Sequence, residues 1–161
     1  MADPLLTIRH FENGDCEAAF ELAGRLGLSP WSIDDYRREL EREDSLMFAA
    51  VHGGDLVGFI IGRLVPSSGP AGGLDAEIYN IGVLAAVHRS GIGSKLIERF
   101  IGICRKNKVV DIWLEVRAAN HAARTFYKNF GFEDFAARPG FYQNPSDDAL
   151  ILRLQASGAG S

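Results

Sequence analysis

The sequence contains few cysteines: of 161 residues, only Cys16 and Cys104 carry a thiol, and they lie far apart in the chain. A disulfide framework needs several cysteines at short spacing, and a structural zinc site needs clustered Cys or His ligands. Neither pattern is present. We therefore expect no metal site and no disulfide, and we interpret both cysteines as free, buried thiols.

Long apolar runs are also missing. The best apolar run, at residues 56–61, is far shorter than the ~18 residues that a membrane-spanning helix needs. The first residues lack the basic region and apolar region of a signal peptide. The sequence therefore predicts a cytoplasmic protein that has no membrane partner.

Positive charge is scarce, with 17 Lys and Arg against 21 Asp and Glu and a formal net charge of -4. A protein that binds nucleic acid by neutralising phosphates needs a basic face. The balance of charges argues against a nucleic-acid partner and favours a basic one.

What remains is an ordinary globular composition, with 47% hydrophobic and 24% charged residues. The length fits one domain, which we place at residues 1–155, followed by a flexible tail at 156–161. Seven segments have the pattern of strands: residues 5–10, 46–52, 56–65, 77–84, 109–117, 132–138 and 149–154. Four have helical periodicity: residues 16–26, residues 33–42, a segment with Leu96, Ile97, Phe100, Ile101 and Cys104 on one face, and residues 120–130. Ser32 followed by Asp35 resembles a capping box before the second helix, and Asn120 is the expected N-cap of the fourth. The order of the strands and helices predicts a mixed α/β (α+β) fold in which a twisted seven-stranded sheet is flanked by about four helices.

The segment "HRSGIGSKLI" (88–97) places two glycines between a predicted strand and a predicted helix. The N-terminus of a helix offers free N–H groups and a positive dipole end, which suit a diphosphate. The dinucleotide fingerprint needs glycine where Leu96 stands, and a Walker loop needs lysine where Ser94 stands. The local residues leave two alternatives open, a phosphate cradle and a plain turn.

Two further side chains are candidates for chemistry. In "DIWLEVRA", Glu115 falls on the strand face opposite the apolar residues, where it is either a catalytic carboxylate or a surface charge paired with Arg117 or with a cation on a neighbouring strand. Tyr127 belongs to an aromatic stripe with Phe126 and Phe130, which is typical of a core position. Its phenol, with a usual pKa of about 10, also stays protonated as a general acid must.

The segments "HRSGIGSKLI", "IWLEVRAANHAARTFYKNFGF" and "RPGFYQNPSDDALILRL" resemble motifs of the GCN5-related N-acetyltransferase (GNAT) superfamily. "PWS" (30–32) and "IYNIGV" (78–83) resemble its bacterial ribosomal-protein-alanine N-acetyltransferase (RimI) type. The resemblance covers nearly the whole chain. It implies the GNAT acyltransferase fold with two splayed central strands, an enzyme, and acetyl-CoA as the cofactor.

The same resemblance implies roles for individual residues. Glu115 is the general base, directly or through water, and Tyr127 is the general acid. The positions implied to bind the cofactor are Ile81, Gly82, Val83, His88, Arg89, Ser90, Gly91, Ile92, Gly93, Ser94 and Asn120. Those implied to bind the acceptor are Trp31, Ser32 and Tyr142. Glu77 and Tyr79, on the predicted central strand, are further candidates for a base or for acceptor binding, and plain alternation on a half-exposed strand is the alternative. For Trp31 and Tyr142, local packing is an equal alternative.

The sequence departs from the family pattern at two places. His88 stands where the family has Arg or Gln, so we expect the loop amides rather than this side chain to hold the cofactor. Residues 66–73, "PSSGPAGG", resemble an insertion before the central strand. We expect a flexible loop there that alters acceptor specificity.

The chemistry of amines favours one acceptor. At pH 7 an α-amine of pKa about 8 is roughly one-tenth neutral, a deficit of ~1.4 kcal/mol, whereas the deficit for lysine is ~4.6 kcal/mol. A single carboxylate base suits the smaller demand. We therefore expect the acceptor to be a protein N-terminus, with the alanine of a ribosomal protein as first choice. Separately, we expect the enzyme to be a monomer or weak dimer. A lysine or small-molecule amine acetyltransferase and a non-catalytic acyl-CoA-binding module are the alternatives.

Overall fold

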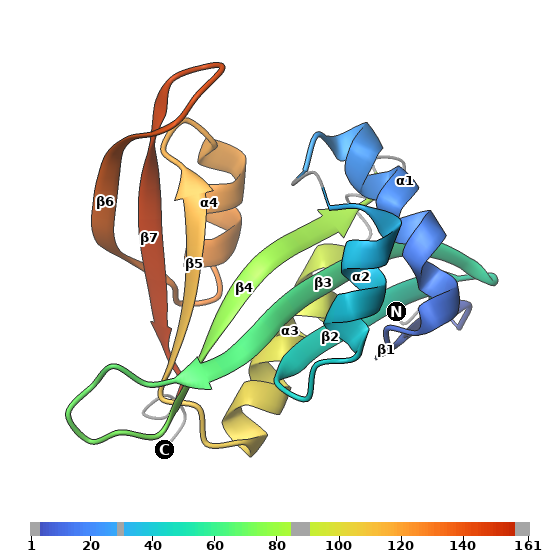
Figure 1. Ribbon diagram of the computed structural model, residues 1–161, viewed down its shortest axis with the longest axis horizontal. Coiled ribbons are helices and arrows are strands. Elements are labelled where there is room, and N and C mark those ends of the chain that lie inside the picture. The colour runs from blue at the N-terminus through green and yellow to red at the C-terminus, as the bar shows by residue number, and fades with distance from the viewer. Residues whose placement is uncertain (1–3, 29–30, 85–90, 157–161) are drawn as a thin grey trace. The chain divides into compact units, whose positions relative to one another are not determined.

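A computed structural model describes residues 4–28, 31–84 and 91–156 (Figure 1). Over these residues the chain forms β1 (Leu6–His10), the 3-10 helix η1 (Asn13–Asp15), α1 (Cys16–Leu26), α2 (Ile33–Leu40), β2 (Ser45–His52), β3 (Asp55–Pro66), β4 (Leu74–Val83), α3 (Ile92–Lys106), β5 (Asp111–Arg117), α4 (His121–Lys128), β6 (Glu133–Tyr142) and β7 (Asp147–Gln155). The predicted mixed α/β fold, with its seven strands and four α-helices, is confirmed.

The seven strands have the order β1-β2-β3-β4-β5-β7-β6. β4 and β5 are parallel, whereas the pairs β1–β2, β2–β3, β5–β7 and β6–β7 are antiparallel. The hairpin between β2 and β3 turns at Gly53 and Gly54, which have positive φ angles of 58° and 91°. Two such residues in succession form the primed turn that matches the twist of a hairpin.

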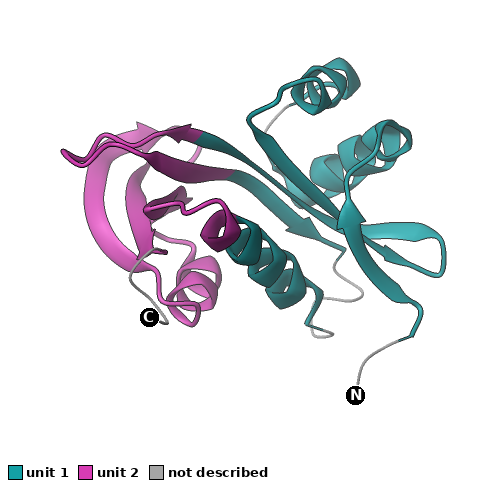
Figure 2. Cartoon of the chain, turned by 90° about the horizontal axis from the view of Figure 1, so that it is seen from below, with its two compact units in different colours: residues 1–64, 79–103 teal, residues 65–78, 104–161 magenta. Residues whose placement is uncertain are grey.

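The chain divides into two compact units, residues 1–64 with 79–103 and residues 65–78 with 104–161 (Figure 2). The boundary at residue 78 falls inside β4, so each unit contains a part of this strand. The predicted single domain at 1–155 stays a prediction. Ala156, the first residue of the predicted tail, is buried and its N–H donates to the Val110 carbonyl at 2.8 Å, and residues 157–161 lie outside the described residues.

In the first unit, α1 and α2 pack over an apolar core. The buried members of this core are Phe11, Cys16, Ala19, Leu22, Ala23, Tyr36, Met47, Ala49, Phe59 and Ile61. The predicted apolar face of α3 is buried as well, at Leu96, Ile97, Phe100 and Ile101. Burial of these side chains supplies the main free energy that orders the unit.

In the second unit, β5 pairs along its length with β7, which in turn pairs with β6. Side chains alternate along β5, so that Ile112, Leu114 and Val116 are buried while Glu115 faces solvent. On α4, the Tyr127 ring lies 5.8 Å from the Phe132 ring between centroids. The alternation along β5 therefore holds Glu115 on the face opposite its buried residues, as the sequence pattern predicts.

Several predicted boundaries were wrong by two residues or more, and three of them show the physical reason. α2 ends at Leu40 rather than 42, because the chain turns there and the Arg42 N–H donates to the Glu39 carbonyl at 3.1 Å. β4 starts at Leu74 rather than 77, since Asp75 is polar yet buried, and its carboxylate accepts from the Trp113 indole N–H at 2.9 Å. β6 runs on to Tyr142 rather than 138, through an irregularity in its register with β7 between Arg138 and Tyr142.

Residues 67–73 connect β3 to β4, and Pro66 is the last residue of β3. The Ser67 N–H donates to the Gly73 carbonyl at 2.9 Å, and the Gly72 N–H donates to the Gly69 carbonyl at 3.1 Å. The segment is thus a hydrogen-bonded loop, and its effect on specificity stays a prediction.

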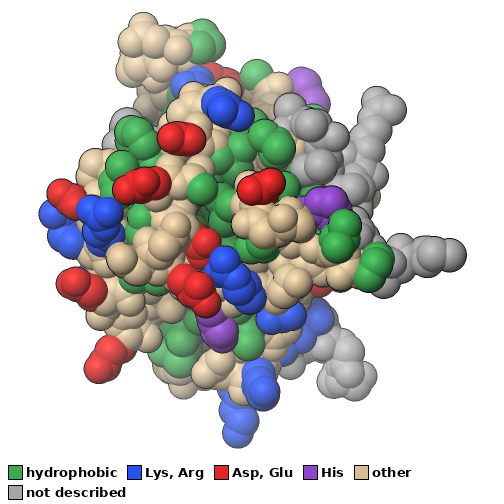
Figure 3. Space-filling model, turned by 90° about the vertical axis from the view of Figure 1, so that its right-hand side faces the viewer, with side chains coloured by type: hydrophobic (Ala, Val, Ile, Leu, Met, Phe, Trp, Pro, Cys, Tyr) green, Lys and Arg blue, Asp and Glu red, His purple; other side chains and the backbone are tan. Residues whose placement is uncertain are grey.

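One face of the molecule carries charges of both signs (Figure 3). On the face drawn in Figure 3, acidic and basic side chains alternate with apolar ones. Within the described ranges, each helix is too short or too polar to span a lipid bilayer.

Candidate active site

Glu115 lies on β5, where its side chain is 35% exposed. Its Oε1 is 3.2 Å from Arg138 Nη1 on β6, which is reached across β7 through the pairs Glu115–Ile151 and Ile151–Ala136. This ion pair matches the structural alternative for Glu115, in which the carboxylate is a surface charge paired with a cation on another strand. A pair this exposed contributes little stability, so the carboxylate can exchange one cation for another.

Tyr142 lies near the same carboxylate. Burial raises the pKa of Tyr142, and the negative charge of Glu115 raises it further, against the opposing charge of Arg117. Arg117 Cζ sits 4.3 Å from the centroid of the Tyr142 ring, and Nη1 of Arg117 donates to the Pro145 carbonyl at 2.9 Å. The second unit therefore brings together one predicted base, Glu115, and one predicted acceptor-binding residue, Tyr142.

Tyr127 lies on α4, whose start is fixed by Asn120. The Asn120 Oδ1 accepts the Ala123 N–H at 3.2 Å, which makes Asn120 the predicted N-cap. Tyr127 is 7% exposed, and burial raises the pKa of its phenol to about 12. The side chain is thus part of the core, as one interpretation held, and also keeps the proton that a general acid needs.

The predicted positions on β4 follow the alternation of the strand. Tyr79 is 39% exposed, Glu77, Ile81 and Val83 are half-buried, and Gly82 is buried. An added Cβ at Gly82 would lie 3.0 Å from Leu28 Cδ1 and 3.3 Å from Phe59 Cε1, so only glycine packs there without a shift of its neighbours. The register between β4 and β5 pairs residues 76–78 with 112–114. The predicted splaying of these strands stays a prediction.

The glycine pair lies at the start of α3. Gly91 has a φ of 79°, which an L-residue with a side chain rarely adopts, and the helix starts directly after it. Gly93 and Ser94 therefore belong to the first helical turn rather than to a loop. The predicted positions His88, Arg89 and Ser90 lie outside the described residues.

Trp31 and Ser32 precede α2. The Ser32 Oγ accepts the Asp35 N–H at 3.1 Å, and the Asp35 carboxylate accepts the Ser32 N–H at 2.7 Å, which is the capping box that the sequence predicts. The Trp31 ring meets the Tyr36 ring edge-on at 5.3 Å. Both residues have structural partners, and their role toward an acceptor stays a prediction.

Sequence reasoning missed Arg138 beside Glu115 and, in the first unit, Arg63, whose Cζ lies 5.3 Å from the Tyr79 ring centroid. Both arginines reach their partners across strand pairs, so only the register could have revealed them. Cys16 and Cys104 are free and buried, as predicted. Among the described residues, no group of three or more His, Cys, Asp and Glu side chains could hold a metal ion.

Comparison with known proteins adds independent evidence. The family model described as "Acetyltransferase (GNAT) family" matches residues 16–132, more than half of the chain. The [ribosomal protein bS18]-alanine N-acetyltransferase of Escherichia coli is 31% identical over 153 residues, which cover 94% of this chain and 98% of the relative. The N-alpha-acetyltransferase RimI of Mycobacterium tuberculosis is 32% identical over 154 residues, covering 92% and 91%.

A solved structure shows the same fold. The crystal structure of the ribosomal-protein-S18-alanine N-acetyltransferase from Escherichia coli matches with a TM-score of 0.83 and 32% identity, and the match covers 97% of each chain. The resemblance predicted from the sequence motifs is confirmed.

Proposed function

The chain belongs to the acetyltransferase (GNAT) family, and from this membership we propose that it transfers the acetyl group of acetyl-CoA to the N-terminal α-amine of a protein. That it is an acetyltransferase and that acetyl-CoA is its acetyl donor follow from the family itself. The observation that carries the choice of acceptor is the 31% and 32% identity, over 94% and 92% of this chain, to two relatives named [ribosomal protein bS18]-alanine N-acetyltransferase and N-alpha-acetyltransferase RimI.

The residues at the start of α3 fit the diphosphate of acetyl-CoA. α3 is a helix of 15 residues, and the first N–H groups of such a helix have no acceptor within it. Gly91 is exposed, and an added Cβ there would meet no described atom within 4 Å, so the backbone is open to a ligand. We assign residues 88–94 to the diphosphate, the strand positions Ile81, Gly82 and Val83 to the pantetheine arm, and Asn120 to cofactor contact.

Bound acetyl-CoA supplies the activated acetyl group, and the protein's own residues handle the protons. Glu115 presents an exposed carboxylate that exchanges Arg138 for the acceptor's ammonium group and takes its proton, directly or through water. Tyr127 holds a proton on Oη for the leaving sulfur, because burial raises its pKa to about 12. A general base and a general acid are what transfer to an amine requires.

Acceptor binding is assigned to exposed and half-buried side chains. Among these positions Tyr142 has the best support, because the charge of nearby Glu115 raises its pKa. Trp31 and Ser32 are added through the family resemblance, and Glu77 and Tyr79 through their positions on β4. The acceptor that we propose is the N-terminal alanine of a ribosomal protein, and the enzyme acts as a monomer or weak dimer.

A peptide library tests this proposal. Peptides that differ in their first residue, each with one internal lysine, are incubated with the protein and acetyl-CoA, and tandem mass spectrometry locates the added acetyl group. We expect the label on the α-amine, with alanine among the best first residues. Label on the lysine instead would make the chain a lysine acetyltransferase, and acetyl-CoA binding without any labelled peptide would favour a binding module.

A further inference from the structure

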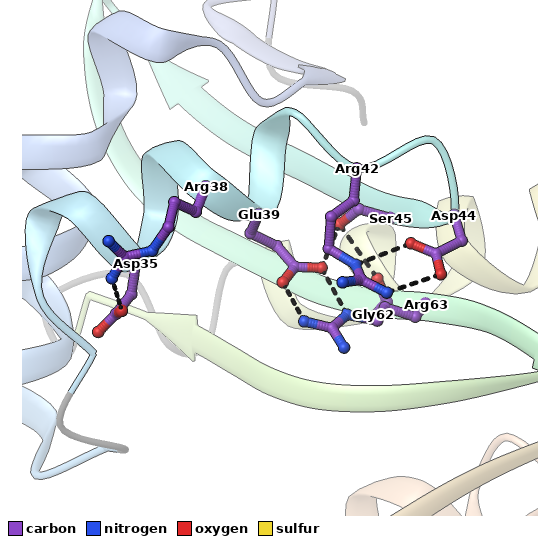
Figure 4. A network of polar contacts seen from close by, with 8 residues as sticks. All are labelled: Asp35, Arg38, Glu39, Arg42, Asp44, Ser45, Gly62 and Arg63. Carbon is purple, nitrogen blue, oxygen red and sulfur yellow. Dashed lines mark hydrogen bonds and ion pairs between the residues drawn. The ribbon is translucent and has the colours of Figure 1, made fainter.

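A buried carboxylate in the first unit has no role in the chemistry described above. Glu39 on α2 is 3% exposed, and it accepts two hydrogen bonds from Arg63 of β3 at 2.5 and 2.8 Å and one from Ser45 Oγ at 2.7 Å (Figure 4). Burial raises the pKa of Glu39, but these hydrogen bonds and the charge of Arg63 outweigh it, so the pKa lies below its usual value. Glu39 is therefore ionised and holds the Arg63 guanidinium in one plane.

Stability alone is a weak reason for this arrangement. Replacing a buried ion pair by apolar residues of similar volume is often neutral or stabilising, because the charges lose their hydration on burial. An ion pair does give what an apolar pair cannot, a guanidinium fixed by a two-point contact with a carboxylate. The question is what the fixed guanidinium does.

The Arg63 guanidinium also contacts the Tyr79 ring. The Arg63 side chain is 29% exposed, and its Cζ lies 5.3 Å from the centroid of the Tyr79 ring, within range for a cation–π contact. Tyr79 belongs to the later part of β4, and its ring is one of the few large exposed apolar surfaces of the described chain. A cation fixed against one ring face restricts the orientation of that ring, which is 39% exposed.

We propose that Arg63, held by Glu39, is a positioning residue that orients Tyr79 for contact with the acceptor peptide. This inference rests on the proposed function, since it takes Tyr79 to be part of acceptor binding. Glu39 and Ser45 set the position of Arg63, and Arg63 sets the position of the Tyr79 ring. The proposed chemistry uses none of these three side chains, so we expect their effect on acceptor affinity rather than on the chemical step.

Kinetics of variants test the proposal. Arg63→Met should raise the KM for peptide about fivefold, as expected for loss of a cation–π contact, while kcat and the KM for acetyl-CoA stay unchanged. The paired replacement Glu39→Met with Arg63→Met should show the same rise at an unchanged or higher Tm, which separates positioning from stability. Arg37→Met is the matched control, because Arg37 on the same helix as Glu39 pairs with exposed Asp34 at 3.2 Å and should leave every constant unchanged.

A double-mutant cycle identifies the residue through which Arg63 acts. Tyr79→Leu should raise the peptide KM, and adding Arg63→Met to it should produce no further rise. A peptide KM that Arg63→Met leaves unchanged, or two effects that multiply in full, would overturn the inference.

A measurement without turnover distinguishes failure of this inference from failure of the proposed function. NMR of ¹³C-labelled tyrosine rings compares the protein with its Arg63→Met variant. A shift of the Tyr79 signals supports the Arg63–Tyr79 contact even if no peptide is acetylated, and unchanged signals overturn it even if peptides are acetylated.

Discussion

Glu115 carries the clearest prediction for a single residue. Glu115→Gln removes the base but keeps the shape of the side chain, so kcat should fall about 10²- to 10⁴-fold. Tm should change little, because the side chain is partly exposed and its pair with Arg138 is a surface pair. The measurement is steady-state acetylation of a peptide beside a thermal melt. Glu133→Gln, at an exposed position of β6, is the control and should keep full activity.

Tyr127 predicts the shape of the pH profile. The kcat/KM for a peptide should rise about tenfold from pH 7 to pH 9 as an α-amine of pKa about 8 becomes neutral. It should then stay level to pH 10, because burial raises the pKa of Tyr127 to about 12 and the phenol keeps its proton. A decline between pH 9 and 10 in the parent protein would contradict this assignment. Tyr127→Phe should lower kcat roughly a hundredfold.

Cys16 and Cys104 are predicted to be inert. Burial raises the pKa of both thiols, that of Cys104 to about 12, so neither forms much of the reactive thiolate near neutral pH. Ellman's reagent should label neither cysteine in the folded protein and both in guanidinium. Rapid labelling of the folded protein would show that one of these side chains is accessible.

Among the elements, the predicted bounds were close for α1 and for β1, β2 and β3, and they were off by two residues or more for α2, α4 and the strands from β4 onward. The bounds of α1 were predicted to the residue, and the caps at Ser32 and Asn120 are present, because apolar periodicity and capping are local signals. β6 is exposed along nearly its whole length, so it has no alternation that could mark its end. Strand limits of this kind depend on pairing with a distant partner, which local residues do not encode.

The cap of α2 gives a prediction at the scale of the element. Ser32→Ala removes the acceptor of the Asp35 N–H, and the free energy of unfolding should fall by about 1 kcal/mol. Ser32→Gly should lower it by only a few tenths of that amount. Urea unfolding measures both. Equal stability of the alanine variant and the parent would mean that the capping box does not hold α2 in solution.

At the scale of the whole molecule, the family motifs predicted the fold, the enzyme class and the acetyl donor. They did not predict the partners of the site residues. The Glu39–Arg63 pair joins residues 24 positions apart, and Arg138 reaches Glu115 across an intervening strand. Such contacts arise only when the sheet register is set, so they had to come from the structure. These contacts determine which partners the site residues have, whereas the motifs indicate which reaction the site performs.

The most direct test of the whole account uses two peptides that differ only in whether the α-amine is free or blocked. Both begin with alanine and contain one lysine, and one has its α-amine blocked. Intact mass spectrometry after incubation with acetyl-CoA should show one added acetyl group on the free peptide and none on the blocked one. Equal labelling of the two peptides would place the acceptor at the lysine and contradict transfer to the α-amine.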